Sequence, residues 1–176
     1  MRAFLSALVI AAALTTAPAA LARSASFVIQ ADHKIGPYAV RKDGSLRGVI
    51  AAYGDPSSVR RHARYREICD VLWRPIGLRI TFYNLGGGNP CAGATGRFGE
   101  ATMTSTRWRT SIGLRVGDSL ARLRALYRGE RPRGAWWWLV TRRSPYGEGG
   151  SYPGLAAKVR GGRVVAFAVR YPAGGD

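Results

Sequence analysis

The chain has 176 residues, and it carries 27 Lys and Arg against 10 Asp and Glu, which gives a formal net charge of +17. Hydrophobic residues make up 47% of the sequence and aromatic residues 10%. This much apolar material excludes a mainly disordered chain in spite of the charge. We therefore expect one globular domain with a single core.

The first 22 residues have the pattern of a secretory signal peptide. Arg2 supplies a positive charge, residues 3–14 form a short apolar stretch, and Ala20-Leu21-Ala22 matches a small-x-small cleavage site. An N-terminal membrane anchor or a buried helix is the alternative, but the stretch is shorter than the ~20 residues that a transmembrane helix needs. We expect no transmembrane segment and a mature chain, beginning at Arg23, that is secreted or resides in the periplasm or cell envelope.

Two segments have the pattern of a short, capped helix. The first covers residues 46–53, with Gly44-Ser45 before it and Gly54 after it, and the second covers residues 120–127, with Asp118-Ser119 before it. Both have apolar residues at helical spacing and begin at a residue that caps helices well. Residues 40–53 align without a gap on residues 114–127, with five identical positions among the fourteen.

Strand patterns follow each helix. Residues 69–73 and 78–83 form a predicted hairpin around Pro75-Ile76-Gly77, and residues 136–141, 155–159 and 164–171 form three more strands, the last two joined by Gly161-Gly162. Weaker strand patterns cover residues 27–29 and 98–103. The sequence therefore predicts an α+β fold of two helix-plus-antiparallel-strand pseudo-repeats, at about 35–91 and 109–171, forming one sheet with helices on one face.

The two cysteines, Cys69 and Cys91, flank the predicted hairpin. Folding the hairpin brings both residues to its open end, and thiols outside the cytoplasm tend to oxidise. A redox-active pair is the alternative, but redox pairs have their thiols three residues apart. We expect a structural disulfide that stabilises the fold by ~3 kcal/mol.

A short motif accompanies both predicted helices: a glycine, a small hydroxyl or acidic residue, and an apolar-spaced helix. The matching residues are Gly44, Ser45, Val49, Tyr53, Gly54 and Pro56 in the first copy and Gly117, Asp118, Ser119, Leu123 and Tyr127 in the second. The motif resembles the unit of the beta-lactamase-inhibitory-protein-like and SmpA/OmlA (BamE-like) exported folds. The resemblance implies short helices on one face of a small antiparallel sheet, acting as an interaction module without catalysis. The second copy lacks the Gly-x-Pro ending, and no lipobox cysteine is present, so only the architecture is carried over.

The residues that enzymes commonly use are sparse. The two histidines, His33 and His62, lie in no nucleophile-elbow or similar context, and no cluster of Cys, His and acidic residues has the spacing of a metal site. Glu100 and Glu148 lie in or near glycine-rich loops, where catalytic groups often occur. We predict no catalytic activity, no cofactor and no metal; a small envelope hydrolase that uses Glu100 or Glu148 is the alternative.

Arginine is the most distinctive component, with 24 arginines against three lysines. Two basic clusters follow the two predicted helices, residues 60–66 (RRHARYR) and 128–133 (RGERPR). Guanidinium groups bind phosphate and carboxylate well, whereas a genomic bias toward arginine would leave only a solvated basic face. The candidate anion-binding residues are Arg60, Arg61, Arg64, Arg131 and Arg133.

Trp136-Trp137-Trp138 lies in a predicted strand. Alternation along a strand puts Trp136 and Trp138 on one face and Trp137 on the other. One face must pack in the core, and the other is a candidate surface for a sugar or a protein.

Together these features predict an exported, non-catalytic binding module of the cell envelope or extracellular space. Its expected partner is a protein or an anionic envelope polymer, with nucleic acid disfavoured. A folding or stability accessory that binds no small ligand is a third class of function.

Overall fold

The computed structural model describes residues 26–145 and 150–171. The predicted signal peptide and Glu148 lie outside these residues. Two α-helices, α1 (Leu46–Tyr53) and α2 (Leu120–Leu126), and the 3-10 turn η1 (Arg74–Ile76) accompany the strands. The strands are β1 (Val28–Gln30), β2 (Lys34–Ile35), β3 (Tyr38–Ala39), β4 (Ser58–Arg61), β5 (Ile68–Trp73), β6 (Leu78–Tyr83), β7 (Arg97–Met103), β8 (Arg109–Thr110), β9 (Pro132–Arg133), β10 (Trp136–Arg143), β11 (Ser151–Arg160) and β12 (Arg163–Arg170).

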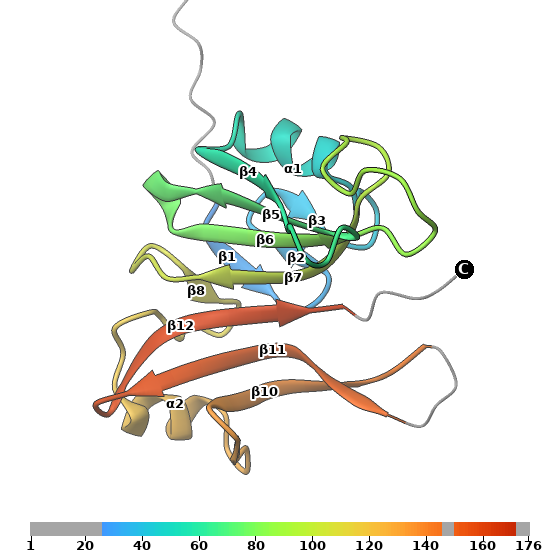
Figure 1. The fold of residues 1–176 in the computed structure, drawn as a ribbon. Helices are drawn as coiled ribbons and strands as arrows, with labels where there is room; N and C mark the ends of the chain where they lie inside the picture. Colours follow the sequence, from blue (N-terminus) through green and yellow to red (C-terminus); the bar gives the residue numbers. More distant parts are fainter. Residues whose placement is uncertain (1–25, 146–149, 172–176) are drawn as a thin grey trace, which may run out of the picture.

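The strands form two sheets. The larger has eight strands in the order β4-β5-β6-β7-β12-β11-β10-β9, and every neighbouring pair in it is antiparallel. Two runs of four strands, β4 to β7 and β9 to β12, therefore meet where β7 pairs with β12. The smaller sheet has the order β3-β2-β1-β8, and it lies behind the larger one in Figure 1.

The predicted α+β fold, with helices covering one face of a single sheet of two pseudo-repeats, is wrong. Strands account for 44% of the described residues and helices for 13%, and the strands form two sheets. The physical reason is helix length. With eight and seven residues, α1 and α2 are too short to cover a sheet of eight strands. The four-stranded sheet covers much of that face instead, with Ile29, Ile35 and Tyr38 buried there.

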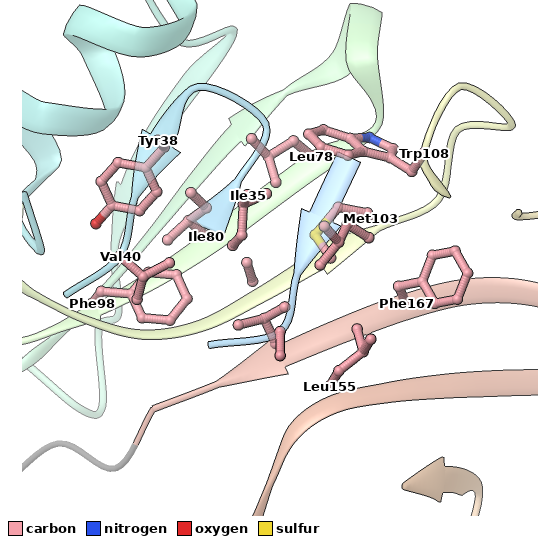
Figure 2. Close-up of a cluster of buried hydrophobic side chains, with 14 of the residues drawn as sticks. Ile35, Tyr38, Val40, Leu78, Ile80, Phe98, Met103, Trp108, Leu155 and Phe167 are labelled. Atoms are coloured by element: carbon pink, nitrogen blue, oxygen red, sulfur yellow. The ribbon is translucent and has the colours of Figure 1, made fainter. Parts of the chain in front are cut away.

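The hydrophobic core lies between the two sheets. Alternation in β6 buries Leu78, Ile80 and Phe82 on one face, and Phe167 on β12 continues this layer beyond Met103 on β7. Figure 2 shows Leu78, Ile80, Met103 and Phe167 in one cluster with Ile35 and Tyr38 of the smaller sheet. We call this side of the eight-stranded sheet the core face and the opposite side the open face.

The helices begin where the sequence predicts. Ser45 caps α1 by accepting a hydrogen bond from the backbone N–H of Gly48, and Ser119 caps α2 in the same way from Arg122. Both helices pack on the core side, because Val49 and Leu123 are fully buried there. The helix starts were therefore predictable, although the small fraction of helical residues in the fold was not.

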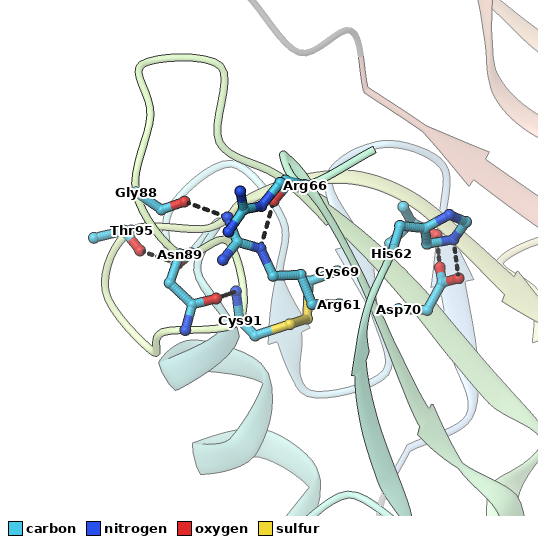
Figure 3. The surroundings of a disulfide bond; sticks show 10 residues. Arg61, His62, Arg66, Cys69, Asp70, Gly88, Asn89, Cys91 and Thr95 are labelled. Carbon is cyan, nitrogen blue, oxygen red and sulfur yellow. Dashed lines mark hydrogen bonds and ion pairs between the residues drawn. A yellow bond between two sulfur atoms is a disulfide. The ribbon is translucent and has the colours of Figure 1, made fainter. Parts of the chain in front are cut away.

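The predicted Cys69–Cys91 disulfide is present, with a Cα–Cα distance of 5.3 Å. Cys69 lies on the core face of β5 and is fully buried. Cys91 belongs to the long loop between β6 and β7. The bond therefore ties this glycine-rich loop to the sheet, and Arg61 lies beside it (Figure 3).

A buried carboxylate forms a second link between segments that are distant in the sequence. The Asp32 side chain, in the turn between β1 and β2, is fully buried, and it accepts hydrogen bonds from Arg41, Arg142 and Tyr152. Burial alone would raise the pKa of Asp32, but the hydrogen bonds from the two guanidinium groups outweigh burial and lower the pKa below its ordinary value. Asp32 thus joins the smaller sheet to the β10–β11 hairpin.

Candidate functional site

The open face of the eight-stranded sheet is polar. Its residues are the ones that alternate with the core residues: Arg79 and Thr81 lie between Leu78, Ile80 and Phe82 on β6. The strand register extends this face across the sheet in rows of side chains. One row contains Ser58, Leu72, Arg79, Thr102, Ala168, Ala156 and Trp138.

Two adjoining depressions lie on this face over β4 to β7, with volumes of about 540 and 350 Å³. They share Leu72, Arg74 and Arg79 as lining residues. We call the continuous hollow the arginine groove. It is lined by Ser58, Arg60, Arg61, His62, Ala63, Asp70, Leu72, Arg74, Gly77, Arg79, Thr102 and Thr104.

Three arginines of the groove form no ion pair within residues 26–145 and 150–171. Among the residues that the structure describes, no carboxylate forms an ion pair with Arg60, Arg74 or Arg79, and all three side chains are exposed. Exposed guanidinium groups without carboxylate partners favour an incoming phosphate, sulfate or carboxylate.

One acid, Asp70, lines the groove in register with Arg60, and it already has other partners. Its Oδ2 lies 3.0 Å from Nε2 of His62, and its Oδ1 accepts a hydrogen bond of 2.7 Å from the Thr81 hydroxyl. Figure 3 shows the His62–Asp70 pair to one side of the disulfide. Both carboxylate oxygens of Asp70 are therefore engaged by His62 and Thr81 and not by the groove arginines.

An aromatic group lies at the other end of the open face. Trp136 and Trp138 on β10 are half-buried, and cations lie over their rings: the Arg133 guanidinium is 4.4 Å from the Trp138 ring centre, and the Lys158 ammonium is 5.7 Å from that of Trp136. We call these four residues the tryptophan edge. Trp137 lies on the core face in register with Ala157, as alternation predicts.

The structure separates the residues predicted to bind anions. Arg60 and Arg61 both line the larger depression, but the Arg61 guanidinium donates to the carbonyls of Arg66 and Gly88 (Figure 3). The Arg64 guanidinium stacks on the Tyr65 ring at 5.5 Å.

The second predicted cluster lies far from the first. Arg131 is exposed just before β9, and Arg133 belongs to the tryptophan edge. Six strand spacings separate Arg60 on β4 from Trp138 on β10, which is about 30 Å at ~4.8 Å per spacing. The seven predicted binding residues therefore form no single site.

Sequence reasoning missed Arg74, Arg79 and the hydroxyls of Thr102 and Thr104. A usable signal existed for Arg79: the alternation Leu-Arg-Ile-Thr-Phe-Tyr over β6 puts arginine on the solvent face once the apolar face is assigned to the core. No comparable signal existed for Arg74, which lies in the 3-10 turn between β5 and β6.

The alternative catalytic acid Glu100 gains no support from its position, and Glu148 lies outside the described residues. The Glu100 carboxylate accepts a hydrogen bond of 2.8 Å from Arg170 on the neighbouring strand, and Glu100 lines neither depression of the groove. Within residues 26–145 and 150–171, no three His, Cys, Asp or Glu side chains gather as a metal site would require. No helix in these ranges has the length and hydrophobicity needed to cross a membrane.

Comparison with known proteins assigns no family. Neither a protein-family model nor a curated protein sequence matches the chain. Among solved structures, it is similar to an extracellular protein containing an SCP domain from Bacillus anthracis str. Ames, with 11% sequence identity and a TM-score of 0.41. The match covers 73% of this chain and 43% of that protein, so the chain spans less than half of its length. At this level the likeness is not evidence of a shared fold or function, and the resemblance stated from the sequence stays a prediction.

Proposed function

We propose that the protein is an exported, non-catalytic module that binds an anionic polymer of the cell envelope or extracellular space through the open face of its eight-stranded sheet. The observation that carries the proposal is the arginine groove, in which Arg60, Arg74 and Arg79 have no carboxylate partner among the described residues. A polymer with repeated negative charges supplies the missing partners along the whole hollow.

The lining of the groove supports a polar ligand over a protein partner. Leu72 is its one large apolar side chain, and Ser58, Thr102 and Thr104 contribute hydroxyls. The centre of a stable protein interface is usually apolar and poor in charged residues. Hydroxyl and guanidinium donors together fit the oxygen atoms of phosphate, sulfate or carboxylate groups.

Export is supported by two independent features. The N-terminal residues have the signal-peptide pattern, and the Cys69–Cys91 disulfide is typical of an oxidising compartment. The non-catalytic part of the proposal rests on the engagement of Glu100 by Arg170 and of Asp70 by His62 and Thr81.

The experiment measures binding of the purified protein to immobilised polyphosphate and polygalacturonate over a series of NaCl concentrations. We expect affinity to fall steeply as salt rises, because exposed charges are screened and counterions are released on binding. The Arg60→Ala/Arg74→Ala/Arg79→Ala variant should bind about tenfold more weakly at low salt, since three exposed pairs of ~0.5 kcal/mol each are lost.

A matched variant separates a site from general charge. Arg47→Ala/Arg109→Ala/Arg115→Ala removes the same charge from exposed positions on α1, β8 and the loop after β8, away from the open face. Equal loss in both triple variants would overturn the groove as the binding site. Binding that does not change with salt, or capture of a protein without any polyanion affinity, would overturn the proposed function.

A further inference from the structure

Resting on the function proposed above, we infer that His62 makes the arginine groove sensitive to pH. The protonated ring adds a cation to the larger depression, so the protein binds an anionic polymer more tightly in acid. His62 lines this depression together with Arg60, Arg74 and Arg79. The inference is carried by that position and by the pairing of His62 with Asp70, the one acid among the described residues that line the depression.

The His62 ring is held at one nitrogen and remains accessible. Its Nε2 lies 3.0 Å from Oδ2 of Asp70 (Figure 3), and the side chain is 40% exposed. The Thr81 hydroxyl donates a 2.7 Å hydrogen bond to Oδ1 of the same carboxylate. No hydrogen bond to the described residues engages Nδ1. A protonated ring therefore keeps one N–H for Asp70 and has a second N–H for solvent or an anion.

Protonation of His62 changes the charge balance of the depression. While the ring is neutral, the Asp70 carboxylate cancels part of the positive field of Arg60, with which it is in register, and of Arg74 and Arg79 from η1 and β6. An imidazolium 3.0 Å from Asp70 cancels that negative charge instead. Imidazole is the side chain that ordinarily changes charge between pH 5 and 8, whereas guanidinium groups stay charged. One positive charge is therefore added to the hollow as the pH falls.

The other charged neighbours of His62 belong to β4 and the loop that follows it. The Arg61 guanidinium also lines the depression and is held by two backbone carbonyls. Arg64 stacks on Tyr65, whose ring centre is 6.3 Å from that of His62. Glu67 lines a separate hollow that Arg61 also borders. These groups keep their charge between pH 5 and 8, so they supply a constant field in which His62 titrates.

The second histidine of the chain is a natural control. The sequence contains only His33 and His62. His33 is also exposed and also lies beside a carboxylate, with its Nε2 3.9 Å from Oδ1 of Asp32. It belongs to the turn between β1 and β2 and lines neither depression of the groove. Protonation of His33 should therefore leave binding in the groove unchanged.

The test measures binding of the purified protein to dextran sulfate at low salt between pH 5.5 and pH 8. The sulfate esters stay ionised over this range, so a change in affinity comes from the protein. The affinity of the parent should rise about threefold from pH 8 to pH 5.5, which is the effect of one added exposed charge pair. His33→Gln should show the same rise. The α-amino group also titrates in this range, but it is common to every variant and cancels in the comparison.

Two substitutions fix the charge at position 62 at opposite values. His62→Gln is neutral throughout and should bind at every pH as the parent does at pH 8. His62→Lys is positive throughout and should bind at every pH about as tightly as the parent does at pH 5.5. Both variants should lose the pH dependence, at affinities about threefold apart. Thermal unfolding at both ends of the pH range checks that each variant is folded during the binding measurement.

Asp70→Asn tests the partner of His62. Loss of the carboxylate should raise the affinity at pH 8 about threefold, because the hollow loses its anion. The rise in affinity on acidification should also move to lower pH, because the imidazolium has lost its carboxylate partner. Asp43→Asn is the matched control, since Asp43 is an exposed acid that lines neither depression. It should leave both the affinity and the pH profile as they are in the parent.

The outcomes separate this inference from the function on which it rests. A parent affinity that does not change with pH, or a pH dependence that survives in His62→Gln, would overturn the role of His62 and leave the arginine groove in place. Weaker binding by both His62→Gln and His62→Lys at every pH would show a structural role only, and would overturn the inference too. Failure of the parent to bind either dextran sulfate or polyphosphate at any pH would overturn the proposed function itself.

Discussion

The two faces of the eight-stranded sheet are made by the same strands, yet they have opposite chemistry. On β6, Ile80 is fully buried against the smaller sheet, while Arg79 beside it is exposed in the arginine groove. The core face holds apolar side chains and the buried Cys69 end of the disulfide, and the open face holds arginines, hydroxyls and tryptophans. Because the two kinds of side chain alternate along one strand, we expect substitutions on one face to change stability and substitutions on the other to change the proposed binding.

The largest effect is expected from the core face. Ile80→Ala removes a fully buried side chain and should lower the free energy of unfolding by about 3–4 kcal/mol, from lost burial and the cavity left behind. Urea unfolding measures this loss. At temperatures well below its midpoint the variant should still bind polyanions as the parent does. A cost below ~1 kcal/mol would contradict the separation of the two faces.

The disulfide gives the next effect. Replacing both cysteines by alanine frees a loop closed over a sequence separation of 22 residues, and the chain-entropy model gives a loss of about 3 kcal/mol. Thermal unfolding with and without reductant measures it. Reductant should destabilise the parent by a similar amount and should leave the Cys69→Ala/Cys91→Ala variant unchanged. Destabilisation of that variant by reductant would show that another effect is at work.

Asp32 is a buried charge, and we expect it to stabilise the fold because it is fully paired. Its substitution tests this expectation. Asp32→Asn should lower the free energy of unfolding by about 2 kcal/mol at neutral pH, because hydrogen bonds to a charged group are lost and two guanidinium groups lose their anion. The pKa of Asp32 is below its ordinary value of 3.8 in the folded protein. Its contribution is therefore fully present above the ordinary pKa and is lost as the pH falls through the lower folded pKa.

Urea unfolding at pH 7 and at several values below 4 measures this dependence. The difference in stability between the parent protein and Asp32→Asn should shrink as the pH falls, since the parent carboxyl becomes neutral too. Asp43→Asn is a suitable control, because Asp43 is exposed and forms no ion pair among the described residues. A difference that grows on acidification would contradict the direction of the Asp32 pKa shift.

Local signals in the sequence predicted much of the local structure. Ser45 and Ser119 mark the two helix starts, Pro75-Ile76-Gly77 marks the turn between β5 and β6, and Gly161-Gly162 marks the turn between β11 and β12. Each of these features depends on a few neighbouring residues. The Cys69–Cys91 pairing was predictable for a different reason, because only two cysteines exist.

The global arrangement was not predictable from the same signals. The strands β2, β3, β8 and β9 have two residues each, too few for a period-2 pattern to be seen. Their pairing depends on contacts between distant segments, as when β1 pairs with β8. The smaller sheet was therefore missed, and the helices were given the covering role that this sheet performs.

The spatial arrangement of the candidate binding residues was unpredictable for the same reason. Residues 60–66 look like one basic cluster in the sequence, but the Arg61 guanidinium is held by the carbonyls of Arg66 and Gly88, and Arg64 stacks on Tyr65 in the following loop. The groove instead gathers Arg60, Arg74 and Arg79 from β4, the η1 turn and β6. A site assembled across strands is visible only when the pairing register is known.

The smallest expected effect on stability is the most direct test of the comparison. Arg79→Ala changes the residue next to Ile80, but its side chain is exposed and has no ion pair with any described acid. Surface substitutions of this kind usually change the free energy of unfolding by less than about 0.5 kcal/mol, and loss of a like charge from the groove offsets part of any lost packing by the arginine stem. Urea unfolding beside Ile80→Ala gives the contrast on one strand. A cost for Arg79→Ala that approaches that of Ile80→Ala would mean that the guanidinium stabilises the fold, and the open face would then be a structural surface and not one kept free for a ligand.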